Sequence, residues 1–214
     1  MARSTDSQPA RAVALLEARG MMRTAEFRAA GITAATVNRL VAAGHVAKVA
    51  RGLYTLPDVA IDLHHPLAAA AKLVRNGVIC LDSALSFHDL TDRMPARVWM
   101  AIGARDWRPT IEALPVAIIR FNDAVFSDGI ESHEIDRVVV RIYGPAKTVS
   151  DMFFHGLRQK RWYDSDIGVA QAVQALKETL RRRKATPAEI AAHARTAGIW
   201  ETVRPYLEAL VADA

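Results

Sequence analysis

The chain has 214 residues, of which 51% are hydrophobic and 24% are charged, a composition typical of a globular protein with one large or two modest domains. Its single cysteine, Cys80, excludes an intramolecular disulfide. The first ten residues are polar, which argues against a secretory signal peptide, and the apolar stretches are too short to span a membrane. We therefore expect a cytoplasmic protein without a membrane partner.

The net charge of +5 is unevenly distributed along the chain. Residues 1–56 carry eight basic and three acidic side chains, whereas the rest of the chain carries 20 of each. Because contacts from Lys and Arg to phosphates dominate affinity for nucleic acids, this asymmetry indicates a polyanionic partner for the first segment. A basic surface that is merely solvated fits the charge equally well.

Three helices are predicted in this first segment. Apolar periodicity indicates a helix over Pro9–Gly20. Thr24 is expected to cap a short helix over Ala25–Ala30, and Thr33 a third over Ala34–Ala43. The tight turn between the second and third helices is typical of a helix-turn-helix motif.

The third predicted helix has two distinct faces. Val37, Leu40 and Val41 share one face and are expected to be buried. The residues expected to point outward are Ala35, Thr36, Asn38, Arg39 and Ala42. Because Asn and Arg can form bidentate hydrogen bonds with base edges in the major groove, this face is typical of a recognition helix. A solvated face tolerates the same residues, so base contact by Asn38 and Arg39 stays open.

A β-hairpin is predicted over residues 45–57, directly after the third helix. Two β-prone runs flank Arg51 and Gly52, and the glycine supplies the positive φ that the turn requires. A hairpin in this position is a wing, and Lys48 and Arg51 on it can reach phosphates or the minor groove. Residues 1–57 are therefore predicted to form a winged helix-turn-helix domain. The residues expected to contact DNA are Arg23, Thr24, Thr33, Thr36, Asn38, Arg39, Lys48 and Arg51.

Residues 64–214 are predicted to form a second domain. We expect helices at 66–75 and 79–90, strands at 98–102 and 116–121, a hairpin pairing 132–135 with 138–143, and helices at 146–154, 167–183, 187–196 and 199–211. The predicted fold class is α+β, with an N-terminal winged helix-turn-helix followed by a mixed domain that has a small, mostly antiparallel sheet and C-terminal helices.

Several of these segments carry a family resemblance. Residues 83–90 and the helix start Gly144–Thr148, together with residues 51–57, 98–102 and 203–210, resemble the AbiEi family of antitoxins from type IV toxin–antitoxin, or abortive infection, systems. The resemblance runs from about Met21 to the end of the chain. It rests on segments that form the fold rather than on catalytic motifs.

The resemblance implies a function for each predicted domain. The N-terminal winged helix is expected to bind inverted repeats in the protein's own promoter and so to act as a transcriptional autorepressor. The C-terminal domain is expected to counteract a nucleotidyltransferase-like toxin that acts on RNA, without the need for a stable complex. The toxin partner follows from the resemblance alone.

No catalytic or metal-binding pattern stands out in the sequence. Asp151 and His155 are four residues apart on a predicted helix, but no third ligand lies at a recognisable spacing. Lys147 and Thr148 at a helix start suggest an anion site, yet the glycines of a phosphate-binding loop are missing and Pro145 removes a backbone donor. A capped helix packed on the sheet is the favoured interpretation. We therefore predict a protein that is not an enzyme and needs no cofactor or metal.

One basic cluster lies outside the first segment. It consists of Lys177, Arg181, Arg182, Arg183 and Lys184. Its charge exceeds what is needed to complement a helix dipole, so a second nucleic-acid or partner patch is a hypothesis. Two other functions stay open: a stand-alone winged-helix transcriptional regulator whose C-terminal domain senses a ligand, and an enzyme with a DNA-binding appendage.

Overall fold

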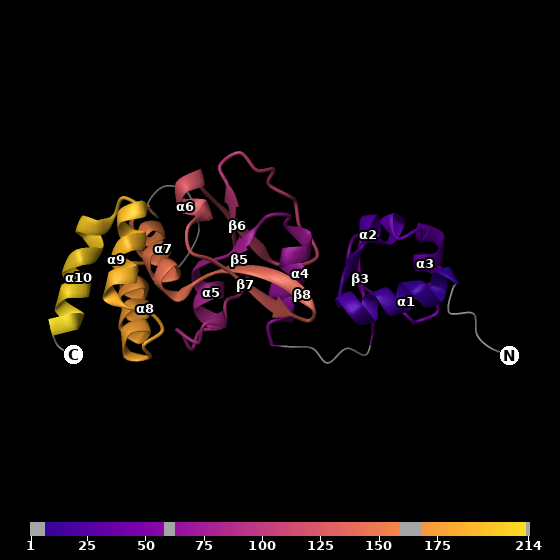
Figure 1. Ribbon diagram of the computed structural model, residues 1–214, viewed down its shortest axis with the longest axis horizontal. Helices are drawn as coiled ribbons and strands as arrows, with labels where there is room; N and C mark the ends of the chain where they lie inside the picture. The colour runs from indigo at the N-terminus through magenta and orange to yellow at the C-terminus, as the bar shows by residue number, and fades with distance from the viewer. Residues whose placement is uncertain (1–6, 58–62, 159–167, 213–214) are drawn as a thin grey trace. The chain divides into compact units, whose positions relative to one another are not determined.

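The computed structural model describes residues 7–57, 63–158 and 168–212 (Figure 1). The chain divides into two compact units. One comprises residues 1–76 with 109–115 and 133–140, and the other comprises residues 77–108, 116–132 and 141–214. Over the described ranges, no helix combines the length and the apolar composition that crossing a membrane requires.

Residues 7–57 form three helices and a small antiparallel sheet. These elements are α1 (Gln8–Arg19), β1 (Met22–Arg23), α2 (Thr24–Ala29), α3 (Ala34–Ala42), β2 (Ala47–Ala50) and β3 (Leu53–Thr55). The strands lie in the order β1-β3-β2. The three predicted helices and the predicted hairpin are confirmed, whereas the short strand β1 was not predicted.

The helices and sheet of this segment enclose one apolar core. Leu16 of α1, Phe27 of α2, Val37 of α3 and Tyr54 of β3 are buried together. The rings of Phe27 and Tyr54 meet edge to face with their centroids 6.0 Å apart, a favourable arrangement for two aromatic side chains. This core holds α3 and the hairpin in a fixed relation to each other.

Two glycines occupy the positions predicted for them, one after α3 and one in the wing turn. Gly44 follows α3 with a φ of 72°, and Gly52 lies in the wing turn with a φ of 74°. Both values fall in the left-handed region that glycine adopts without strain. The carbonyl of Gly52 accepts hydrogen bonds from the backbone N–H of Thr24 at 2.9 Å and from its hydroxyl at 3.4 Å. The wing turn is therefore tied to the start of α2.

The start of α2 differs from the prediction. Arg23, rather than Thr24, occupies the N-cap position, and Thr24 is the first helical residue. The Glu26 carboxylate accepts a hydrogen bond from the Arg23 backbone N–H at 2.6 Å. The Thr24 hydroxyl is directed instead to Gly52, which lies 28 residues away in sequence, so a local capping pattern does not describe it.

The rest of the described chain forms a five-stranded sheet with helices around it. The helices are α4 (His65–Leu73), α5 (Leu81–Phe87), α6 (Asp123–Ser127), α7 (Pro145–Arg158), α8 (Val169–Arg181), α9 (Pro187–Thr196) and α10 (Trp200–Ala212). The strands are β4 (Val78–Ile79), β5 (Val98–Gly103), β6 (Val116–Phe121), β7 (Ile130–Ile135) and β8 (Val138–Tyr143), in the order β6-β5-β4-β8-β7. The predicted α+β class is confirmed.

The sheet is mixed, which departs in detail from the prediction of a mostly antiparallel one. Strand β5 is parallel to β6, and β4 is parallel to β8 but antiparallel to β5. Residues 79–90 were predicted as one helix, yet Val78–Ile79 forms the central strand and α5 begins at Leu81. A short apolar run that is buried on all sides fits a helix and a strand equally well, so periodicity alone could not separate them.

Two features with local sequence signals are confirmed. Asp136 and Arg137, predicted as the turn between β7 and β8, have φ values of 50° and 60°. Two successive positive values are typical of the tight turns that match the twist of a hairpin. Thr186 caps α9 as predicted, because its side chain accepts a hydrogen bond from the backbone N–H of Glu189.

Helix α7 is central to the packing of the second unit. It packs against α5, α8 and α9, and α10 packs against α9 (Figure 1). Its residues Val149, Met152 and Phe153 are fully buried, together with Tyr143 from β8 and Leu176 from α8. This core joins the sheet to the C-terminal helices.

Candidate nucleic-acid interface

Helix α3 presents two of the predicted DNA-contacting residues to solvent. Asn38 and Arg39 are exposed, whereas Val37 and Leu40 are only 1% and 7% exposed. Val41, which was also expected in the core, is half-buried. Polar side chains with base-reading chemistry therefore occupy the outer face of this helix.

Thr36 corrects the sequence prediction. It was expected to point outward, but it is only 2% exposed. Thr36 precedes Leu40 by four residues, and such residues share one face of a helix, so it lies on the buried stripe. Its Oγ1 donates a hydrogen bond to Oε1 of Gln8 at 2.9 Å and accepts one from Nη2 of Arg39 at 3.2 Å. The expected outward orientation of Thr36 is therefore wrong, whereas its contact with DNA stays a prediction.

Thr33 caps α3 as predicted. Its Oγ1 accepts a hydrogen bond from the backbone N–H of Thr36 at 3.2 Å and donates one to Oε1 of Gln8 at 3.3 Å. The residue itself is exposed at the start of the helix. It can still approach a phosphate, but its hydroxyl already has protein partners.

The remaining candidates differ in exposure. Arg23 and Thr24 are half-buried at the start of α2, whereas Lys48 on β2 and Arg51 in the wing turn are exposed. The two wing cations directly follow α3 in the chain, at the position from which a wing meets the DNA backbone. Asn38, Arg39, Lys48 and Arg51 are therefore the best-placed members of the predicted set.

Gln8 and Arg11 have roles that the sequence did not reveal. Both lie on α1, and their hydrogen-bond partners lie 19 to 28 residues further along the chain. Nη2 of Arg11 donates to the carbonyl of Ala30 at 2.5 Å, in the turn between α2 and α3. The side chain of Gln8 meets the start of α3. No local pattern marks either contact in the sequence.

A helix-turn-helix followed directly by a β-hairpin defines the winged helix-turn-helix class of DNA-binding domain. Comparison with known families then shows which winged-helix family this segment is similar to. Residues 11–57 match a family model described as a transcriptional regulator, AbiEi antitoxin. The resemblance to the AbiEi family that we predicted from the sequence is confirmed over this segment.

A solved structure extends the comparison beyond the first domain. The chain is similar to the crystal structure of the RV2827C protein from Mycobacterium tuberculosis, with a TM-score of 0.53 and 14% sequence identity. The similarity covers 96% of this chain and 80% of that one. At this identity it shows a shared fold and nothing further. A search of curated proteins found no match.

The predicted C-terminal basic cluster lies at the end of α8, on the surface. Lys177, Arg183 and Lys184 are exposed. Arg181 and Arg182 share an acidic partner that the sequence prediction had not considered: Oε2 of Glu178 lies 2.6 Å from Nη2 of Arg181 and 3.2 Å from Nε of Arg182. These hydrogen bonds lower the pKa of Glu178. Part of the positive charge of the cluster is therefore balanced within the helix.

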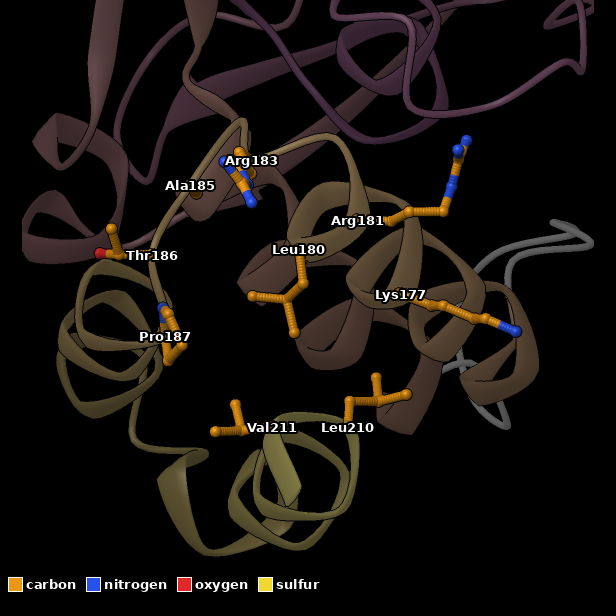
Figure 2. Close-up of a pocket in the computed structure, with 9 residues that line it drawn as sticks. All are labelled: Lys177, Leu180, Arg181, Arg183, Ala185, Thr186, Pro187, Leu210 and Val211. Carbon is orange, nitrogen blue, oxygen red and sulfur yellow. The ribbon is translucent and has the colours of Figure 1, made fainter. Parts of the chain in front are cut away.

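An apolar groove of about 740 Å³ adjoins this cluster. It is lined by Lys177, Leu180, Arg181, Arg183, Ala185, Thr186, Pro187, Leu210 and Val211. In Figure 2, Leu180 points toward the middle of the groove, whereas the charged ends of Lys177 and Arg181 extend away from it. Among the described residues the lining holds no acidic side chain. The groove therefore combines apolar walls with a basic edge.

The helix start that resembled an anion site is instead part of the core. Lys147 is 1% exposed and its ammonium forms an ion pair with Asp151. Its Nζ also lies 4.4 Å from the ring centroid of Tyr143 and 4.9 Å from that of Phe121. The Thr148 hydroxyl donates to the carbonyl of Tyr143 at 3.1 Å. This supports the favoured interpretation of a helix packed on the sheet.

The predicted Asp151–His155 pair is likewise structural. His155 is 5% exposed and its ring lies 5.6 Å from that of Trp99, centroid to centroid. Burial lowers the pKa of this imidazole. Within the described ranges, no cluster of three His, Cys, Asp or Glu residues could hold a metal ion.

Proposed function

We propose that this chain is a DNA-binding antitoxin and transcriptional autorepressor of a type IV toxin–antitoxin operon. In this proposal residues 1–57 form the DNA-binding domain and residues 64–214 form the antitoxin domain, which counteracts a nucleotidyltransferase-like toxin. The protein acts in the cytoplasm by occupying DNA and by opposing the toxin, and it is not an enzyme.

The exposed pair Asn38 and Arg39 on the third helix is the observation that carries this proposal. The pair lies within the segment that matches the AbiEi antitoxin model, and the cations Lys48 and Arg51 follow it on the wing. Base-edge contacts from the helix would select a sequence in the promoter, and phosphate contacts from the wing would add affinity for any sequence. Repression then follows from occupancy of the promoter.

A binding titration tests the DNA-binding part. The full chain is titrated against the DNA upstream of its own gene, with a scrambled duplex of equal length and base composition as control, over a series of salt concentrations. We expect tight binding to the upstream DNA that weakens steeply with salt. Equally weak binding to both duplexes would contradict the proposal.

Co-expression tests the antitoxin part. A nucleotidyltransferase-like toxin gene next to the gene of this chain is expressed with and without the full chain, and bacterial growth is measured. We expect growth to recover when the chain is present. Equal growth arrest with and without the chain would contradict the antitoxin role, and only the role as a transcriptional regulator would remain.

The groove beside α8 favours a second candidate function, a regulator whose C-terminal domain senses a ligand. Its volume lies within the range of small-molecule sites, and apolar walls with a few charged groups are typical of them. The basic edge suits a small carboxylate with an apolar body, for which decanoate is a probe. Calorimetry should detect decanoate but not decyltrimethylammonium, and Leu180→Gln should abolish the signal.

Arg183 and Arg182 provide a matched pair of variants for the same experiment. Arg183 lines the groove with a positive φ, so Arg183→Asn removes the charge while keeping a residue suited to this backbone. Arg182 carries the same charge in the next position but does not line the groove, so Arg182→Asn is the control. Equal decanoate affinity in both variants would contradict a role for the basic edge.

A further inference from the structure

A hydrogen-bond network joins the start of α1 to the start of the recognition helix. Oε1 of Gln8 accepts hydrogen bonds from the backbone N–H and the hydroxyl of Thr33, at 3.2 and 3.3 Å, and from the hydroxyl of Thr36, at 2.9 Å. Gln8 is the first residue of α1 and its partners follow 25 and 28 residues later. The two hydroxyl oxygens also lie 3.0 Å apart, so Gln8, Thr33 and Thr36 form one connected network.

The network continues to Arg39. Nη2 of Arg39 donates a hydrogen bond to Oγ1 of Thr36 at 3.2 Å. Because the Thr36 hydroxyl donates to Gln8, its oxygen lone pairs are directed toward the guanidinium. Because the Thr36 hydroxyl is neutral, this hydrogen bond does not balance the positive charge of Arg39. A guanidinium has five N–H donors, and this bond leaves enough of them for a bidentate contact with guanine.

Holding an exposed arginine in one orientation has an energetic consequence for binding. A free arginine side chain samples many rotamers, and this conformational entropy is lost when it docks on a base. A side chain already held by Thr36 loses less on binding, and its donors start from a defined direction. Both effects favour a base whose acceptors match that direction.

We propose that Gln8, acting through Thr36, positions Arg39 and thereby sets the base preference of the recognition helix. This inference rests on the proposed binding of DNA by α3. Gln8 and Thr36 are positioning residues in this scheme, because Arg39 is the only one of the three that touches a base. The network also caps α3, so the test must separate orientation of Arg39 from stability of the helix.

Variants at Thr36 provide that separation. Thr36→Val keeps the shape of the buried side chain but removes both the acceptor for Arg39 and the donor to Gln8, whereas Thr36→Ser keeps the hydroxyl. Gln8→Ala removes the acceptor of the Thr36 hydroxyl on the side of α1 but leaves Thr36 and Arg39 in place, and Gln8 itself is only half-buried. The DNA probe is the duplex that the wild-type chain selects from a random-sequence library, with single-base changes as competitors. Thermal unfolding of each variant is measured in parallel.

We expect Thr36→Val and Gln8→Ala to lose about tenfold in discrimination between the selected duplex and its best single-base competitor, within the range of one bidentate base contact. The slope of log affinity against log salt should stay unchanged, because the phosphate contacts are the same. Thr36→Ser should discriminate like the wild type. In an Arg39→Ala background, Thr36→Val should have no further effect, since its role acts through Arg39.

Each result decides the proposal. If the wild type selects a sequence but Gln8→Ala and Thr36→Val, folded like the wild type, discriminate as well as it does, positioning of Arg39 is wrong. An equal loss from Thr36→Val with and without Arg39 would overturn it too, because the effect would not pass through the arginine. If the wild type selects no sequence, the proposed DNA-binding function fails, and this inference with it.

Discussion

Lys147 and Asp151, one turn apart on α7, form an ion pair that is almost closed to solvent. Their side chains are 1% and 0% exposed. Two aromatic rings, those of Tyr143 and Phe121, lie against the ammonium. Oδ2 of Asp151 has no hydrogen-bond partner among the described residues. A charge in such surroundings is tolerated only while its partner is present, so each residue of the pair depends on the other.

Removal of one partner should therefore destabilise the protein strongly. Lys147→Met leaves the Asp151 carboxylate buried and alone, and we expect the free energy of unfolding to fall by about 3–5 kcal/mol. The double variant Lys147→Met/Asp151→Leu has no buried charge and should recover most of this loss. Denaturant unfolding of the wild type and the variants measures both effects. A double variant no more stable than Lys147→Met would contradict a dominant charge penalty.

The same pair predicts a pH dependence of stability. Burial raises the pKa of Asp151 to about 6, although the charge and hydrogen bond of Lys147 act in the opposite direction. In the unfolded chain the carboxyl returns to its ordinary value of 3.8. Between these values the folded state binds more protons than the unfolded state. The contribution of this carboxyl to stability is therefore full below about pH 4 and is lost as the pH rises through about 6.

The measurement compares the wild type with Asp151→Asn from pH 4 to pH 7. The amide does not titrate, so the difference in unfolding free energy between the two proteins isolates this carboxyl from other groups. We expect the wild type to lose stability relative to the variant as the pH rises. The opposite slope would show that the attraction of Lys147 outweighs burial.

Local signals in the sequence predicted a large part of the fold. The caps of α3 and α9 by Thr33 and Thr186 depend on residues within one helical turn, and the wing turn depends on Gly52 itself. Residues close in the chain determine these features, so the sequence alone is enough to predict them.

Features decided by distant partners were missed. Ile79 lies in a strand because it pairs with Met100 and Ile142, neither of which its immediate neighbours reveal. Thr36 was assigned to the outer face of α3 because only Val37, Leu40 and Val41 were taken as the buried face. Its position places it beside Leu40, and its hydroxyl meets Gln8 on α1. The outer residues Asn38 and Arg39 were predicted because helical periodicity alone determines their face.

Arg39 and Arg51 should differ in how they affect DNA binding. Arg39→Ala removes a base-reading side chain, and we expect discrimination between the wild-type-selected duplex and its competitors to fall by about 1–3 kcal/mol. Arg51→Ala removes a wing cation, which should weaken binding to all sequences alike and reduce the salt slope by about 1. Fluorescence anisotropy titrations at several salt concentrations measure both quantities. A uniform loss from Arg39→Ala, with no change in discrimination, would assign it to a phosphate instead.

Glu178 provides the sharpest test of the C-terminal basic cluster as a second nucleic-acid patch. Its carboxylate pairs with Arg181 and Arg182, and these hydrogen bonds lower its pKa. If the cluster contacts DNA, Arg181→Ala/Arg182→Ala should weaken binding only modestly, because both charges are already partly balanced.

Glu178→Gln should have the opposite effect, because it removes the acid and leaves both cations for phosphates. We expect tighter binding and a salt slope larger by about 1 than that of the wild type. Glu201→Gln is the matched control, since Glu201 is an exposed acid paired with Arg204 on α10, outside the cluster. If both glutamine variants change the affinity equally, the effect is one of net charge and the cluster has no specific contact with DNA.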